Sequence, residues 1–219
     1  MSKLAVLLVD DHAIVREGYR ALLAKQPGMT VVAEACDMPS AYTAFKASHP
    51  DVVITDITLP GSSGLELISR IRQRCADARI LVFSMHQSPA IALKAVHAGA
   101  LGYVTKSSPP EILLRAIVDV AARRHTLSPD IAQALAIDRL KGNRMALDTL
   151  TVREFEILML LIGGQTVDAI ATHLNISPKT VQNSHYLIKS KLGVATDIEL
   201  VRLCIQLDVL DLLALRGEG

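Results

Sequence analysis

The sequence predicts an α/β fold, a doubly wound parallel sheet of five strands, followed by a small all-α domain. Three observations lead to this prediction. Through about the first 124 residues, five short apolar stretches alternate with five helical patterns, as in a parallel sheet covered by helices on both faces. From Leu150 onward the apolar residues recur with helical spacing alone. Half of the 219 residues are hydrophobic and only 3% are aromatic, which is typical of an aliphatic globular chain and excludes a disordered one.

Helix-breaking residues separate the elements of the α/β half. Pro27-Gly28 and His49-Pro50 end the first two helical patterns, and Gly99 ends the fourth. The strands are expected over residues 4–9, 30–35, 52–56, 79–83 and 101–104, and the helices over 12–25, 39–47, 64–74, 90–98 and 110–123. The apolar stripe of the first helix is expected to consist of Ile14, Tyr19, Leu22 and Leu23.

Polar side chains stand at the ends of four expected strands. Asp10 and Asp11 follow the first strand, Asp56 ends the third, Ser84 follows the fourth and Lys106 the fifth. The carboxyl ends of parallel strands open on one edge of the sheet, where ligands bind, so these side chains are expected to gather there. Three neighbouring carboxylates repel one another and need a cation, and oxygen ligands at a shallow edge suit Mg²⁺. Lys106 and Ser84 then remain to hold an anion beside the metal, and phosphate is the obvious candidate.

This set of residues, together with Leu59-Pro60 and Gly64 after Asp56, resembles the receiver domain of two-component response regulators. The resemblance covers about the first 124 residues, so a receiver domain is expected over 1–124. It implies that Asp56 is the phosphoacceptor and that Mg²⁺ is the cofactor. The implied Mg²⁺ ligands are Asp10, Asp11, Asp56 and the backbone carbonyl of Thr58. Lys106 pairs with the phosphoryl group, Ser84 turns its hydroxyl toward it, Tyr103 follows as the switch aromatic, and His86 occupies a position at which the family varies its dephosphorylation rate.

The rest of the sequence predicts a linker over 125–148 and helices beyond it. Ser128-Pro129-Asp130 begins a short linker helix, with proline at its first position. Thr151 and Glu154 have the spacing of a capping box. Helices are expected over 151–162, 167–174, 177–192 and 197–206, the third closed by Gly193. Two helices joined by the short turn 175–178, the second of them longer, fit helix-turn-helix geometry.

This portion resembles the DNA-binding domain of the NarL/LuxR family. The resemblance implies a LuxR-type helix-turn-helix domain over 149–219 that binds double-stranded DNA. The residues that carry it are Leu150-Thr151, Arg153-Glu154, Leu158, Gly164, Ile170-Ala171, Leu174, Ile176-Ser177, Thr180-Val181, Ile188 and Lys191-Leu192. Val181, Ile188 and Leu192 should point to the core. The face expected to meet DNA consists of Lys179, Thr180, Gln182, Asn183, Tyr186 and Lys189.

Together the two resemblances imply a phosphorylation-controlled DNA-binding transcription regulator of a two-component system. A histidine kinase would donate the phosphoryl group to Asp56, and phosphorylation would favour a homodimer. The chain is not expected to be an enzyme in its own right, because a receiver only takes part in phosphoryl transfer and slow autodephosphorylation. The first residues enter a strand directly and no apolar run is as long as a membrane span, so we expect a cytoplasmic protein without a membrane partner.

Two alternatives remain at this point. One is a response regulator whose DNA binding has degenerated and that acts through protein contacts. It gains some weight because the family commonly has lysine where this chain has Gln182, and because residues 144–219 hold more acidic than basic side chains. The other is an aspartyl-phosphate hydrolase with Asp56 as nucleophile. Such enzymes commonly need a second aspartate two residues on, where this chain has Thr58.

Overall fold

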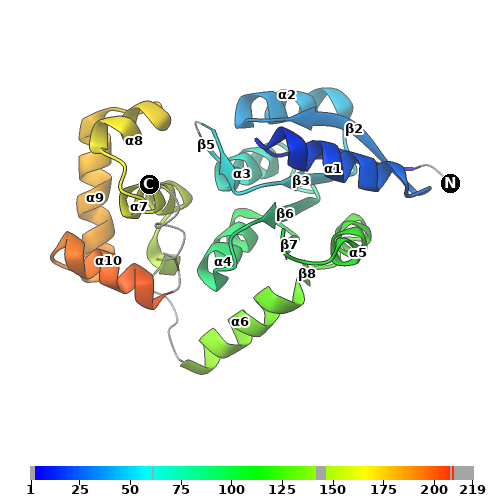
Figure 1. The fold of residues 1–219 in the computed structure, drawn as a ribbon. Helices are drawn as coiled ribbons and strands as arrows, with labels where there is room; N and C mark the ends of the chain where they lie inside the picture. The colour runs from blue at the N-terminus through cyan, green and yellow to red at the C-terminus, as the bar shows by residue number, and fades with distance from the viewer. Residues whose placement is uncertain (1–2, 61, 142–146, 208, 210–219) are drawn as a thin grey trace. The chain divides into compact units, whose positions relative to one another are not determined.

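The computed structural model describes residues 3–60, 62–141, 147–207 and 209. The chain divides into two compact units, one containing residues 1–87 and 95–133 and the other containing 88–94 and 134–219 (Figure 1). Within the described ranges, none of the helices combines the length and the apolar character that crossing a membrane requires.

The first unit is built on a parallel sheet with the strand order β2-β1-β3-β6-β7-β8. The predicted α/β architecture is confirmed, with six strands in place of five. The additional strand, β8, pairs with β7 through two residues that lie in the region expected to be a linker. Two residues are too few to show a periodicity, so β8 could not be predicted from the sequence pattern. The strands are β1 (Leu4–Val9), β2 (Met29–Ala35), β3 (Val52–Thr55), β6 (Ile80–Ser84), β7 (Gly102–Thr105) and β8 (Thr126–Leu127).

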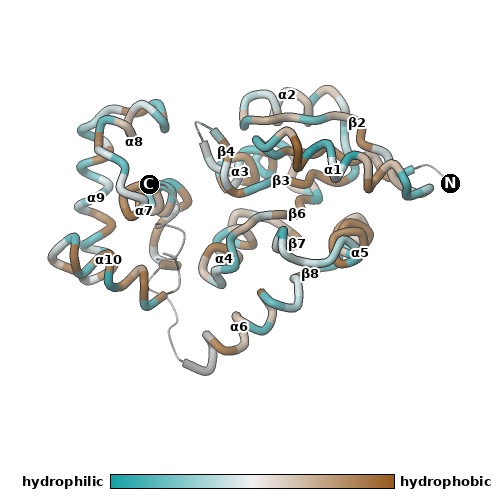
Figure 2. Tube along the Cα trace, in the orientation of Figure 1, coloured by the Kyte–Doolittle hydropathy of each residue, from teal (hydrophilic) through white to brown (hydrophobic). Residues whose placement is uncertain are grey.

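Helices α1 (Ala13–Ala24) and α5 (Pro110–Ala121) share one face of this sheet. Helix α5 consists largely of hydrophobic residues, shown in brown in Figure 2. Because alternate strand residues point to the same face, every second residue of the central strands belongs to this core. The cluster includes Val6, Leu8, Leu23, Val52, Ile54, Leu81, Phe83, Val104, Leu113, Ile117 and Val120.

Helices α2 (Met38–Ser48) and α3 (Gly64–Arg74) also belong to the first unit, and a small antiparallel pair, β4 (Thr58–Leu59) and β5 (Ser62–Ser63), precedes α3. Helix α4 (Pro89–Ala98) is divided between the units at Ala95. The expected stripe of α1 is only partly confirmed. Leu23 is fully buried and Tyr19 packs edge-on against Phe83, but Ile14 is 89% exposed. Ile14 lies in the first turn of its helix, where helical spacing alone does not determine which side chains the sheet covers.

After α6 (Pro129–Lys141), the second unit continues as a short 3₁₀ turn (Leu147–Thr149) and four helices. These are α7 (Val152–Ile162), α8 (Val167–His173), α9 (Pro178–Leu192) and α10 (Asp197–Gln206). The predicted capping box of Thr151 and Glu154 is confirmed. Gly193 ends α9 with a positive φ of 68°, a conformation that glycine adopts without strain. The core of this unit includes Phe155, Leu158, Ile170, Val181, Ile188, Leu200 and Cys204.

Candidate functional site

The strand order brings the four polar strand ends together. β1 pairs with β3, β3 with β6 and β6 with β7, all in parallel, so their carboxyl ends open on one edge. The register places Val9 beside Thr55, so the following residues, Asp10 and Asp56, are also neighbours. Lys106 is held beside Ser84 by a backbone hydrogen bond of 2.8 Å. The sequence therefore folds into the arrangement that the spacing of these residues predicted.

Lys106 joins two of the carboxylates directly. Its Nζ lies 2.6 Å from Asp56 Oδ2 and 2.6 Å from Asp10 Oδ2. Asp10 and Asp56 are only 3% and 4% exposed, so both charges need a partner within the protein. Burial opposes the charge on Lys106, but the two carboxylates outweigh it and raise the pKa of the ammonium. The three groups therefore form a buried, charge-paired cluster.

Backbone amides orient the two buried carboxylates. Asp56 Oδ1 accepts hydrogen bonds from the amides of Ile57, at 2.6 Å, and Thr58, at 3.3 Å. Asp10 Oδ1 accepts one from the amide of His12, at 2.9 Å. One carboxylate oxygen of Asp56 is therefore held by backbone amides, and the other faces the Lys106 ammonium.

Asp11 has a carboxylate oxygen that accepts no hydrogen bond from the described residues. One ligand atom each from Asp10, Asp11 and His12 lie within 4.8 Å of one another. Asp11 Oδ1 lies 2.8 Å from His12 Nδ1 but without hydrogen-bond geometry. Among the described residues, this buried oxygen therefore has no hydrogen-bond partner. The carboxylates of Asp10 and Asp11, the latter with an unsatisfied oxygen, are suitable ligands for a hard divalent cation, which prefers oxygen to imidazole nitrogen.

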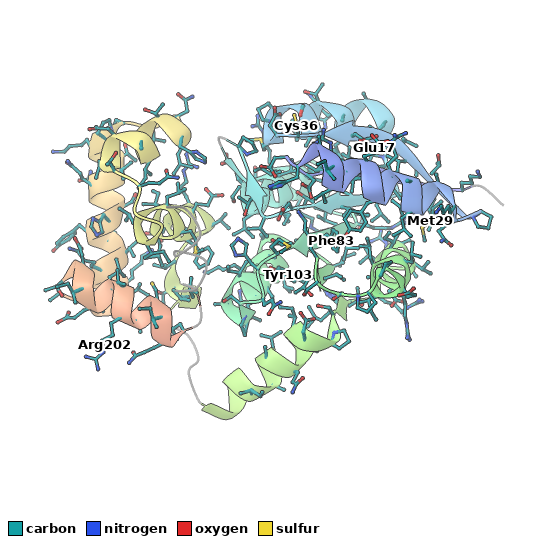
Figure 3. The ribbon with its side chains drawn as sticks, viewed as in Figure 1. Glu17, Met29, Cys36, Phe83, Tyr103 and Arg202 are labelled. Atoms are coloured by element: carbon teal, nitrogen blue, oxygen red, sulfur yellow. The ribbon has the colours of Figure 1, made fainter. Side chains whose placement is uncertain are left out.

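The other predicted residues of the edge lie around this cluster. Ser84 is fully buried, and its hydroxyl accepts a hydrogen bond from the His86 amide at 3.4 Å. Tyr103 is also fully buried and donates to the His86 carbonyl at 2.8 Å, and burial raises the pKa of its hydroxyl. Figure 3 shows Tyr103 and Phe83 in the interior of the first unit. Thr58 is exposed, and its hydroxyl lies 3.2 Å from His86 Nε2.

Two supporting contacts were not predicted from the sequence. Arg16 donates to the carbonyl of Asp10 at 2.6 Å and so fixes the start of the acidic pair. The Thr105 hydroxyl donates to Asp130 Oδ2 at 2.7 Å, which ties the residue before Lys106 to the first turn of α6. Residues 105 and 130 are far apart in sequence and sit in unrelated patterns, so no local signal was available for this pair.

In the second unit, α8 and α9 form the predicted helix-turn-helix pair. Val181, Ile188 and Leu192 are buried, as predicted. The opposite face of α9 exposes the other polar candidates: Lys179, Thr180, Gln182, Asn183 and, at 72% exposure, Tyr186. Lys189 differs from them because its side chain is only 23% exposed and lies 2.8 Å from Asp197 Oδ1.

Ion pairs fix α9 against the rest of its unit. Lys191 Nζ lies 2.7 Å and 2.6 Å from the two carboxylate oxygens of Glu154 on α7. Burial disfavours the Glu154 carboxylate, but Lys191 and the Thr151 donors outweigh this and lower the pKa of Glu154. Arg153 donates to the carbonyl of Leu174, at the end of α8, at 2.6 Å. The Lys191–Glu154 pair therefore ties α9 to α7, and the Arg153 contact ties α7 to the end of α8.

Comparisons with known proteins agree with both halves of this description. The "Response regulator receiver domain" family matches residues 6–118, and "Bacterial regulatory proteins, luxR family" matches residues 148–204. The response regulator UvrY of Escherichia coli K12 is 36% identical over 203 residues, which cover 92% of this chain and 93% of UvrY.

Solved structures give the same result. A two-component response regulator of the LuxR family from Aurantimonas sp. SI85-9A1 is 53% identical with a TM-score of 0.62, over 64% of this chain and 99% of that one. RcsB of Salmonella enterica serovar Typhimurium, bound to promoter rprA in the presence of the phosphomimetic BeF₃⁻, is 28% identical with a TM-score of 0.71, over 92% of this chain and 98% of that one. The chain therefore belongs to the NarL/LuxR family of two-component response regulators, in which a receiver domain is joined to a LuxR-type helix-turn-helix domain.

Proposed function

We propose that the protein is a phosphorylation-controlled transcription regulator in which Asp56 accepts the phosphoryl group and α9 binds double-stranded DNA. The observation that carries the first part is the buried Asp56 carboxylate at the sheet edge, with the Lys106 ammonium 2.6 Å away. Phosphoryl transfer requires a nucleophile, here the carboxylate, and a cation that stabilises the negative charge of the phosphoryl oxygens, here the ammonium.

In this proposal a histidine kinase is the donor. One carboxylate oxygen of Asp56 forms a bond to phosphorus while the bond from phosphorus to the kinase histidine breaks. Lys106 pairs with the phosphoryl oxygens, and the backbone amides of Ile57 and Thr58 keep the acyl group in place. Asp10, Asp11, Asp56 and the Thr58 carbonyl would hold Mg²⁺, which when bound neutralises charge on the phosphoryl oxygens.

The switch proposed for Ser84 and Tyr103 follows from their surroundings. The Ser84 hydroxyl would leave the His86 amide and donate to a phosphoryl oxygen, which changes the end of β6. Tyr103 is already buried and donates to the His86 carbonyl. The movement of Ser84 would therefore stabilise the buried position that the Tyr103 ring already occupies. Thr58 and His86, whose side chains are in contact, would limit access of water to the phosphoryl group and so slow autodephosphorylation.

The exposed face of α9 is the proposed DNA-binding surface of a cytoplasmic regulator. Gln182 and Asn183 offer paired hydrogen bonds to adenine edges, and the exposed Lys179 is placed for a phosphate contact. Lys189, expected to share that role, lies 2.8 Å from Asp197 instead. Solved structures of RcsB include two dimers bound to two parallel DNAs, which supports a homodimer as the DNA-binding form. We propose that phosphorylation favours this dimer. The comparisons give no support to the alternative in which DNA binding has been lost.

Asp56→Asn tests the proposal because it removes the nucleophile and keeps the shape. The full-length variant should take up no label from radioactive acetyl phosphate in the presence of Mg²⁺, whereas Asp77→Asn, at an exposed carboxylate remote from the site, should be labelled like the wild type. Phosphorylated wild type should then bind genomic fragments more tightly than Asp56→Asn. Equal labelling of Asp56→Asn and wild type would show that Asp56 is not the acceptor.

A further inference from the structure

A lysine and a histidine of α9 contact one carboxylate. Asp197 Oδ1 lies 2.8 Å from Lys189 Nζ and 2.9 Å from His185 Nε2. His185 and Lys189 are four residues apart, so both side chains leave α9 on the same side. Asp197 is the first residue of α10, and the turn after Gly193 brings it back to this side of α9.

Local structure favours the charged form of the Asp197 carboxylate. It lies in the first turn of α10, where the helix dipole stabilises an anion, and Thr196 and Glu199 close that end with a capping box. The hydrogen bond from Lys189 lowers the pKa of Asp197 against the small opposing effect of burial, and His185 adds to this lowering. A persistent negative charge therefore stands beside the face of α9 that carries the DNA candidates.

Lys179 provides the contrast within the same helix. It lies in the first turn of α9, its side chain is exposed, and within the described part of the chain it has no ion-pair partner. Lys189 has its ammonium bound to an acid, and its side chain is mostly covered. Two lysines of one helix thus differ in their freedom to reach a phosphate.

We infer that Asp197 is an intramolecular competitor of DNA phosphate: it holds Lys189 in the protein and so limits the affinity of the recognition helix. This inference rests on the proposed DNA binding and deepens it. A DNA phosphate must displace the Asp197 carboxylate before it can bind Lys189, whereas Lys179 can bind a phosphate without such a displacement. The competing carboxylate keeps non-specific affinity low, so that specific contacts and the joining of two protomers decide where the regulator binds.

The salt dependence of binding measures this competition. The full-length protein is titrated with a mixed-sequence DNA duplex over a range of salt concentrations, and the slope of log K against log salt counts the phosphates neutralised. Lys179→Met should flatten the wild-type slope by about 0.9, the loss of one contact, while Lys189→Met should leave it nearly unchanged. Asp197→Asn should steepen the slope by about 0.9 and tighten binding about two- to fivefold at moderate salt, as expected for removal of one exposed pair.

Two controls keep the result specific. Asp168→Asn changes the net charge equally at an exposed site on α8, and should leave the slope unchanged because it frees no lysine. The double variant Asp197→Asn/Lys189→Met should return to the wild-type slope. The inference is overturned if Lys189→Met flattens the slope as much as Lys179→Met does, or if Asp197→Asn leaves the slope unchanged. The two lysine variants leave the α10 cap intact, so their comparison does not depend on how Asp197→Asn folds. A wild type that binds no duplex at all would instead refute the proposed DNA binding.

Discussion

Gly64 lies against the backbone of Asp56. A β-carbon built on Gly64 would approach the carbonyl oxygen of Asp56 to 1.9 Å, a separation that non-bonded atoms do not reach. The amide of Gly64 also donates to the carbonyl of Ile57 at 2.7 Å. The absence of a side chain at residue 64 thus allows α3 to begin directly beneath the proposed phosphoacceptor.

Gly64→Ala should therefore disable the site without touching any of its reactive groups. The methyl group must displace the backbone at residue 56, and such overpacking typically costs about 1–3 kcal/mol of stability. We expect labelling by acetyl phosphate to slow by at least about tenfold, since misplacement of a reacting group by about 1 Å can cost a hundredfold. Gly18→Ala is the control, because a β-carbon there meets no atom within 4 Å and alanine is favoured in a helix. Equal labelling rates for both variants would contradict the argument.

Asp11→Ala should weaken Mg²⁺ binding and slow phosphoryl uptake, because it removes the carboxylate with the unsatisfied buried oxygen. Loss of a ligand should cost at least as much as loss of an outer-shell partner, about tenfold in affinity. Calorimetric titration with Mg²⁺ measures this directly. His12→Ala should change the affinity little, since Mg²⁺ prefers oxygen ligands, and a larger loss with His12→Ala than with Asp11→Ala would reverse the assignment.

Gln182→Lys tests whether the exposed face of α9 reads bases. If Gln182 pairs with an adenine edge, the lysine should blur or change the site preference, by roughly 1–3 kcal/mol for one good pair, while raising non-specific binding. Selection of bound sequences from a random pool, for both proteins at equal salt, shows the preference. An equal rise in binding to all sequences would show that Gln182 reads nothing.

Glu154→Gln should change the pH dependence of stability. The pKa of Glu154 is lower in the folded chain than its ordinary value, so the pair with Lys191 stabilises the fold above that ordinary value and is lost as pH falls through the folded pKa. The variant should be less stable at neutral pH, by about 1 kcal/mol for a partly exposed pair, and should lose less of its stability on acidification. Urea midpoints at several pH values measure both effects. Lys191→Met should remove the share of this pH dependence that the lysine contributes and leave the share of the Thr151 donors. An undiminished dependence in both variants would rule out this pair as its source.

The sequence predicted the sheet edge well because each of its residues ends an apolar strand, and parallel strands leave little freedom for where those ends lie. Asp10, Asp56 and Lys106 meet for this reason. Helix ends were predictable where a cap has a short-range pattern, as with Thr151 and Glu154. The prediction was weaker for exposure on helices, because helical spacing shows a face but not what covers it. The exposure of Ile14 could therefore not be predicted from its helical spacing. The pairing of Lys189 could not be predicted either, because its partner, Asp197, lies in the next helix and no pattern in α9 indicates it.

The short strand β8 affects how the first unit can be separated from the second. The Thr126 amide of β8 donates to the carbonyl of Leu101, and the amide of Ser128, directly after the strand, donates to the carbonyl of Tyr103. A fragment ending at residue 124 would leave these carbonyls on an open strand edge, which invites pairing with another chain and aggregation. It would also lack Ile131, which is fully buried. A fragment extended to residue 133, where the first unit ends, keeps both. We therefore expect a stable fragment of the regulatory half to include residues that the sequence pattern assigns to the linker.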